Sequence, residues 1–236
     1  IKTLKNRILK SAKFPIIIIG SKKVLKKELK KLKVKINLQN FGNQANLSKK
    51  NIYFIDIPID LKNFSLVKKN SYIAKSFKIA LNLLKKGDAL ALINGPISKT
   101  TFLKGKYNGI TEFLAFKTRS HNEVMFLFNK DLSVSPMTTH IPINKVAQKI
   151  KKKIIINKIN SINNFYKKFL GFKPRIAVTG LNPHCETFKG KNIEKTEILP
   201  AIKILRKKKI KVLGPLSADT VFLKENRKKF NIIVGM

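Results

Sequence analysis

The sequence predicts an α/β fold. Short apolar runs alternate with longer segments in which apolar residues recur at helical spacing. Helix-capping serines and helix-ending glycines separate the two kinds of segment, as Ser21 and Gly87 do. Several polar, histidine-containing segments also follow directly after apolar runs. This order is typical of strands joined by helices, with ligand-binding loops at the strand ends.

The first half of the chain contains the clearest alternation. Three short apolar runs are expected to form strands: residues 15–20, 52–57 and 89–94. Between them the pattern predicts one helix over residues 22–32, which starts after Ser21, and another over residues 65–86, which Gly87 ends.

The second half adds an antiparallel element. Residues 124–128 and 132–137 flank an Asn-Lys-Asp tripeptide and predict a hairpin, which would make the sheet mixed. Asn144 is expected to cap a long basic helix that reaches Phe169, with Gly171 at its end. The remaining pattern predicts strands at 175–179, 211–213 and 231–236 and a helix at 194–208.

Length and composition favour a soluble, folded protein. The 236 residues are 43% hydrophobic, enough to bury a sizeable core. Apolar runs stay far below the ~20 residues that a membrane-spanning helix needs. The single cysteine, Cys185, excludes an internal disulfide framework and suits a reducing compartment. We therefore expect a cytoplasmic protein without a membrane partner.

The charge of the chain is strongly positive. A formal charge of +39 arises from 51 Lys and Arg against 12 Asp and Glu, and such a balance ordinarily indicates a polyanionic partner. The lysines are nevertheless spread over every helix-like segment, and no zinc-finger spacing or stacking-aromatic motif accompanies them. We expect no dedicated nucleic-acid partner. A basic, noncatalytic polyanion-binding protein remains an alternative that rests on charge alone.

Two of the three histidines follow strand-like runs directly. His140 lies in Thr-Thr-His-Ile-Pro, and His184 lies in Gly-Leu-Asn-Pro-His. Imidazole is the commonest protein ligand of metals, so a pair on separate loops could anchor one divalent ion. The alternative is that each histidine is a solvated loop residue or is hydrogen-bonded to a backbone group.

Five segments, read in order, resemble the successive signature segments of the PdxA family of 4-hydroxythreonine-4-phosphate dehydrogenases. They are residues 94–99, 109–115, 138–142, 180–184 and 214–220. The resemblance implies a fold of the isocitrate and isopropylmalate dehydrogenase type, with two subdomains, approximately 1–106 and 107–236, around a cleft. NAD binds this fold without a glycine-rich fingerprint, and no residues of the chain are assigned to it.

The resemblance also implies a reaction in vitamin B6 (pyridoxine) biosynthesis. NAD would oxidise the secondary alcohol of 4-phosphooxy-L-threonine, and the β-keto acid would lose CO2 to give 3-amino-2-oxopropyl phosphate. In this family a divalent ion, such as zinc, magnesium or cobalt, is held with the substrate by three histidines from both chains of a homodimer. An ion at the hydroxyl lowers its pKa and stabilises the enolate that follows decarboxylation.

Carried over by position, His140 and His184 match two metal ligands. Asp219 matches the acidic residue beside the ion, with a helix N-cap as its alternative role, and Thr111 matches a substrate contact. The family's third histidine lies in a Tyr-His-Asp-Gln segment beyond the position of Met236. We therefore expect an internal fragment, lacking both terminal segments, that is inactive by itself.

Ile110 departs from the family, which usually has a histidine before that threonine. An isoleucine cannot hydrogen-bond a phosphate. Either nearby lysines supply the charge, with Lys99 as the candidate, or the substrate differs. A paralogous dehydrogenase of 4-phosphothreonate or 4-phosphoerythronate therefore remains open.

Overall fold

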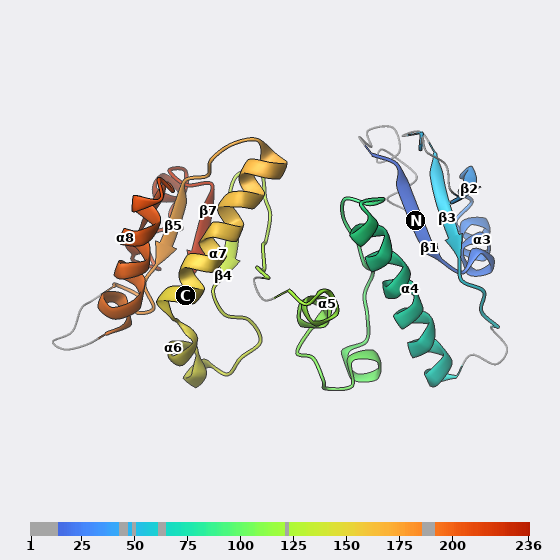
Figure 1. The fold of residues 1–236 in the computed structure, drawn as a ribbon, viewed down its shortest axis with the longest axis horizontal. Helices are drawn as coiled ribbons and strands as arrows, with labels where there is room; N and C mark the ends of the chain where they lie inside the picture. The colour runs from blue at the N-terminus through green and yellow to red at the C-terminus, as the bar shows by residue number, and fades with distance from the viewer. Residues whose placement is uncertain (1–13, 43–46, 49–50, 61–64, 121–122, 186–191) are drawn as a thin grey trace. The chain divides into compact units, whose positions relative to one another are not determined.

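The computed structural model describes residues 14–42, 47–48, 51–60, 65–120, 123–185 and 192–236 (Figure 1). The chain divides into two units, Ile1–Lys106 and Tyr107–Met236, and each is described by itself. Among the described helices, none combines the length and the apolar character needed to cross a bilayer.

The first unit contains a parallel three-stranded sheet with the order β1-β3-β2. Its elements are β1 (Ile16–Gly20), α3 (Lys22–Lys31), β2 (Leu38–Asn40), β3 (Ile52–Asp56), α4 (Leu66–Lys86) and the π-helix η1 (Lys99–Leu103). The Ser21 hydroxyl accepts the Val24 amide proton at the start of α3. Gly87 ends α4 in the left-handed conformation, at φ 82°. Both predicted helices and the first two predicted strands are confirmed.

The strand predicted for residues 89–94 is wrong. This segment has no regular structure, and Leu90 and Ile93 are 67% and 95% exposed. Within the described residues no strand pairs with it. An apolar run indicates a tendency to be buried, whereas a strand also requires a neighbour for its backbone hydrogen bonds.

The second unit contains a parallel four-stranded sheet with the order β4-β7-β5-β6. Its strands are β4 (Ser133–Pro136), β5 (Ile176–Thr179), β6 (Val212–Leu216) and β7 (Ile232–Gly235). The expected mixed sheet is wrong for these strands, because the predicted hairpin is reduced to one antiparallel bridge between Leu127 and Val134. The Asn129 side chain accepts the Asp131 amide proton, so a local turn replaces further ladder bonds.

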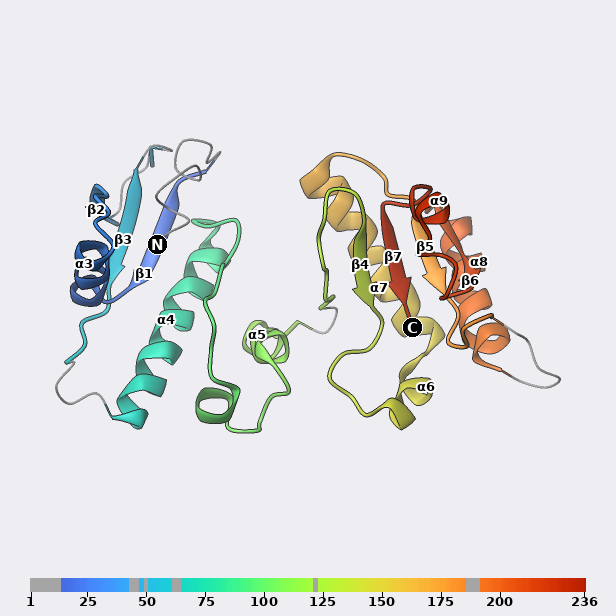
Figure 2. The same ribbon diagram turned by 180° about the vertical axis from the view of Figure 1, so that it is seen from behind.

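Two helices cover one face of this sheet, α7 (Lys152–Phe165) and α8 (Leu199–Lys207) (Figures 1 and 2). Alternate strand residues face them: Ile176 and Val178 pack with the helices, while Ala177 packs on the other face with Val221 and Phe230. The remaining helical segments are α5 (Ile110–Thr118), η2 (Ile143–Lys145), α6 (Val146–Lys149), η3 (Tyr166–Leu170), η4 (Glu194–Ile198) and α9 (Lys224–Arg227).

The single helix expected from Asn144 to Phe169 is interrupted. After α6, Ile150 adopts an extended backbone and its side chain is fully buried, so the chain turns to place it in the core. A carboxylate oxygen of Glu197 then accepts the Lys152 amide proton at 2.6 Å and caps α7 from outside its own segment. Gly171 ends the helical region as predicted, at φ 78°.

Replacing Ile202 with alanine is expected to reduce the free energy of unfolding by about 2–5 kcal/mol, because the side chain is 1% exposed in the main core. Ile204 lies on the same helix but is 36% exposed, and its replacement should cost much less. Urea unfolding of both variants measures the difference. Equal losses would contradict the description of the core.

Candidate functional site

The predicted site residues His140, His184 and Asp219 follow β4, β5 and β6. Because these strands are parallel, the three loops leave the sheet at the same carboxyl edge. Strand β7 lies between β4 and β5, which places those two strands about 10 Å apart. The structure thus places both histidine loops at one edge of the sheet, and a ligand shared by His140 and His184 stays a prediction.

His184 pairs with Asp219, and the contact joins two of the signature segments. The His184 Nδ1 atom lies 3.1 Å from the Asp219 Oδ2 atom. The Ser217 hydroxyl hydrogen-bonds the same carboxylate and lies 2.9 Å from the Pro183 carbonyl oxygen. The Ser217 hydrogen bond, followed by the charge of His184, lowers the pKa of Asp219. The carboxylate is therefore ionised at neutral pH and can orient the imidazole ring.

His140 has a carboxylate partner of its own. Its Nδ1 atom lies 3.4 Å from the Glu112 Oε1 atom, which is also 3.4 Å from the Thr139 hydroxyl. A Cβ atom on Gly109 would lie 2.8 Å from Glu112 and 3.1 Å from the His140 ring, so glycine permits this close approach. His140 adopts the left-handed conformation at φ 54°, an uncommon backbone state that is enriched at functional sites.

Glu194 is a site-supporting residue that sequence reasoning missed. Its side chain is 0% exposed, and its Oε1 atom accepts hydrogen bonds from the Leu181 amide (3.0 Å), the Asn182 amide (2.9 Å) and the Asn182 side chain (3.1 Å). The carboxylate therefore fixes the loop that carries His184. The only signal in the sequence was that acidic residues are rare, with 12 in the whole chain.

The backbone around Cys185 closes tightly on itself. A Cβ atom on Gly180 would lie 2.6 Å from the Cys185 sulfur, and Cys185 has a left-handed backbone at φ 57°. Burial raises the pKa of the Cys185 thiol, so the sulfur stays protonated and is a poor nucleophile. Its contact with Gly180 gives it a packing role in this loop.

Thr111 and Lys99 lie in different units of the chain. Thr111 is exposed in the first turn of α5, and the N-cap residue Gly109 makes no side-chain cap there. Open amide groups at a helix N-terminus favour an anion, so this position suits a phosphate contact. Lys99 is exposed at the start of η1 in the first unit. Both assignments stay predictions.

The donor chemistry of the two histidines suits a divalent ion. The described part of the chain contains no ready group of three or more His, Cys, Asp and Glu side chains for a metal. Each histidine does place Nδ1 beside a carboxylate, as metal-bound histidines usually do, and Nε2 is left to act as a ligand. Among the described residues, the buried Glu112 Oε2 atom also has no hydrogen-bond partner, and it would favour a nearby cation. His140 and His184 remain the predicted ligands.

Replacing Glu194 with alanine is expected to lower the free energy of unfolding by about 2–5 kcal/mol, because it removes a fully buried side chain and leaves two partly buried backbone amides unpaired. The matched control is Glu225→Ala, which removes an exposed ion pair with Lys228 and should cost less than about 1 kcal/mol. Urea unfolding compares them. Similar losses for both variants would show that Glu194 does not fix the loop.

Comparison with known proteins supports the resemblance. The family model described as "Pyridoxal phosphate biosynthetic protein PdxA" matches residues 12–236. The chain is 37% identical over 231 residues to the 4-hydroxythreonine-4-phosphate dehydrogenase of Sulfurihydrogenibium, a match that covers 93% of the chain and 70% of that protein. It is 36% identical to the D-threonate 4-phosphate dehydrogenase of Salmonella typhimurium, over 67% of the chain and 50% of the relative.

A solved structure agrees with these matches. The crystal structure of a 4-hydroxythreonine-4-phosphate dehydrogenase from Burkholderia phymatum superposes with a TM-score of 0.82 at 30% identity and covers 99% of the chain and 74% of that structure. The related proteins are named as dehydrogenases, which are oxidoreductases. The ordered signature segments, the parallel sheets and these matches together show that the chain belongs to the PdxA family.

Proposed function

We propose that the chain is part of a metal- and NAD-dependent dehydrogenase that oxidises and decarboxylates 4-phosphooxy-L-threonine in vitamin B6 biosynthesis. The observation that carries the proposal is the 3.1 Å contact between His184 and Asp219 at the carboxyl edge where His140 meets Glu112. Two imidazoles that are each oriented by a carboxylate, at one edge of the sheet, favour a metal-binding role for these loops over a purely structural one. The family match supplies the reaction class.

Each residue has a role in this proposal. His140 and His184 would hold the divalent ion, which when bound supplies Lewis acidity toward the substrate hydroxyl. Asp219 and Glu112 hold the two imidazole rings in orientation through Nδ1. The Thr111 hydroxyl donates to a phosphate oxygen of the substrate. NAD, when bound, would accept the hydride of the oxidised carbon, and we propose a cytoplasmic homodimer as the working form.

A second substrate is favoured by one specific observation. Ile110 stands at the first position of α5, where the family usually supplies a histidine to the substrate phosphate. One relative of the chain is named a D-threonate 4-phosphate dehydrogenase, so family members differ in substrate. The candidate alternative is therefore oxidation of a phosphorylated hydroxy acid without the amino group, such as 4-phosphothreonate.

The test is NADH formation by the full reading frame with each substrate, with and without a metal chelator. We expect turnover of 4-phosphooxy-L-threonine that the chelator abolishes. Asp219→Asn should reduce kcat/KM by about 10- to 100-fold, because it weakens the support of His184. Asp88→Asn, at an exposed position after α4, is the control and should leave kcat/KM unchanged.

Three outcomes decide between the readings. Turnover of 4-phosphothreonate alone would show that this compound, and not 4-phosphooxy-L-threonine, is the substrate. Activity that survives the chelator would contradict the metal role. Equal effects of the Asp219 and Asp88 variants on kcat/KM would show that Asp219 does not support the site.

A further inference from the structure

An exposed group of phenylalanines lies at the C-terminal end of the helical region formed by α7 and η3. This aromatic patch consists of Phe165, Phe169 and Phe172, with Phe128 from the segment before β4, and each residue is 38% to 58% exposed. The first three lie four and three residues apart in the sequence, the spacing of one helix face. A single exposed apolar residue is ordinary, whereas a contiguous group of large ones marks an interaction surface.

Two further rings hold the patch against the core. The Phe126 ring centroid lies 5.2 Å from that of Phe165 and 6.0 Å from that of Phe128. The Tyr166 ring centroid lies 5.3 Å from that of Phe172, and Tyr166 is buried. Phe126 and Tyr166 pack in turn with the main core. The fold therefore fixes the patch in place, and its rings are not free to turn inward.

The charges beside the patch are almost all positive. Four exposed lysines flank its residues in the sequence: Lys130, Lys167, Lys168 and Lys173. The Lys168 Nζ atom lies 5.4 Å from the centroid of the Phe169 ring. Within the described residues, none of the four lysines forms an ion pair with a carboxylate. Asp131 is the one acidic residue in the segments 126–131 and 164–173.

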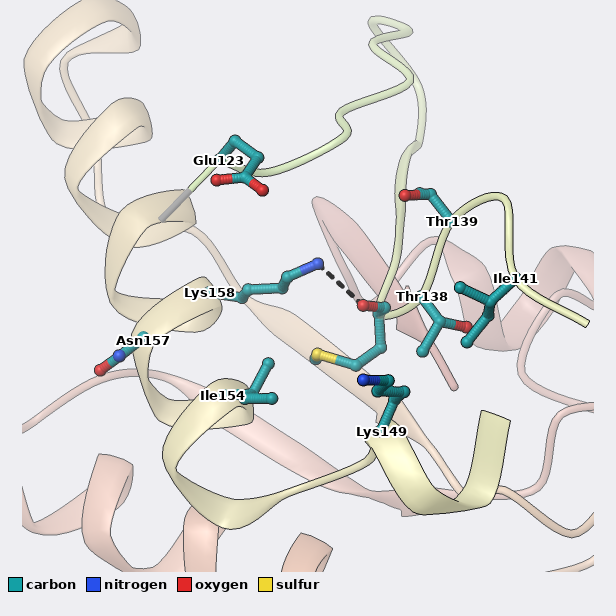
Figure 3. A pocket seen from close by; sticks show the side chains of 9 residues that line it. Glu123, Thr138, Thr139, Ile141, Lys149, Ile154, Asn157 and Lys158 are labelled. Carbon is teal, nitrogen blue, oxygen red and sulfur yellow. Dashed lines mark hydrogen bonds between the residues drawn. The ribbon is translucent and has the colours of Figure 1, made fainter. Parts of the chain in front are cut away.

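A lysine in the middle of α7 is engaged within its own unit instead. The Lys158 ammonium donates to the Met137 carbonyl oxygen at 2.8 Å, and Figure 3 shows the Glu123 carboxylate on the same side. Burial lowers the pKa of Lys158, and the charge of Glu123 acts against this shift. The lysines beside the patch have no such partners and are open to an external anion.

Phenylalanine and lysine together match the surface of an anionic bilayer. Interfacial segments place Phe and Leu at the boundary of headgroups and acyl chains, while their lysines attract anionic lipids. Protein interfaces are rich in Arg but depleted in Lys, and a second copy on a two-fold axis would bring these lysines against each other. Stacked bases need ring faces spread along a strand, whereas the Phe165 and Phe169 rings contact each other at 5.2 Å.

We propose that the aromatic patch and its four lysines attach the protein peripherally to an anionic membrane surface, with Phe128, Phe169 and Phe172 entering the headgroup region. Such attachment needs no helix that spans the bilayer. The expectation of no membrane partner rests on the length of apolar runs, and a patch assembled by the fold does not appear in them. The proposal goes beyond the dehydrogenase function and does not depend on it.

The chain contains no tryptophan, so one substitution introduces a unique fluorophore. Phe169→Trp places it in the patch. Phe116→Trp is the matched control, because Phe116 is 64% exposed on α5 and has the Lys117 ammonium 5.9 Å from its ring. With vesicles of phosphatidylcholine and phosphatidylglycerol in equal parts, we expect the emission of the Phe169→Trp variant to shift to shorter wavelength and to be quenched by brominated acyl chains. The emission of the control should do neither.

Vesicle partitioning at fixed ionic strength separates insertion from charge. Phe169→Ser should weaken partitioning about tenfold, and Phe116→Ser less than about twofold. Lys168→Gln should weaken it about fivefold. Lys153→Gln, at an exposed position near the other end of α7, should weaken it less than about twofold. Nonspecific attraction by a chain of charge +39 predicts instead equal losses for the two lysines and none for either phenylalanine.

The proposal is overturned if the two lysine variants lose equally, if Phe169→Ser partitions unchanged, or if both tryptophan variants are quenched alike. It is also overturned if Phe169→Ser keeps vesicle binding but loses self-association in sedimentation or binding of an oligothymidylate, since the patch would then serve a protein or a nucleic acid. NADH formation by the full reading frame should be unchanged in Phe169→Ser. The outcome is thereby distinguished from a failure of the dehydrogenase proposal.

Discussion

The parallel pairing of β7 between β4 and β5 is the constraint on which the candidate site depends. Ile232 and Val234 of β7 face α7 and α8 in the main core, and Ile233 faces the opposite cluster. These buried side chains fix the register of the sheet, because a slip of one residue would exchange its two faces. Once the register is fixed, the loops after β4, β5 and β6 must emerge at one edge.

Acidic residues then determine how those loops are held. The chain has 12 acidic residues against 51 basic ones. Glu112 and Asp219 each contact a histidine, and Glu194 accepts hydrogen bonds from the loop that carries His184. Glu197 accepts the Lys152 amide proton and so caps α7 from a different segment of the chain. These four acidic residues lie near loops or helix ends, where a carboxylate can accept hydrogen bonds from open amide groups.

Much of the fold could be predicted from local signals. Ser21, Ser65 and Gly87 mark helix ends through bonds and backbone conformations that depend on neighbouring residues alone. The strand expected at residues 89–94 and the single long helix were wrong because they depend on distant partners: a pairing strand in one case, and the core position of Ile150 in the other.

The same distinction applies to the site. The histidines and Asp219 could be found from motifs, since each motif lies within a few residues. Glu112 and Glu194 could not be assigned their partners, because these contacts span 28 and 12 residues and depend on the packing of a helix against a loop. Their roles follow only from the three-dimensional arrangement.

The central claim is that His140 and His184 share one divalent ion. Titrating the full-length protein with Co²⁺ and following its visible absorption measures this directly, because the spectrum reports nitrogen ligands as well as affinity. We predict that His140→Ala and His184→Ala each weaken Co²⁺ binding strongly and that the double variant is little worse than either single variant. Independent, additive losses, or a spectrum that neither substitution changes, would contradict a shared ion.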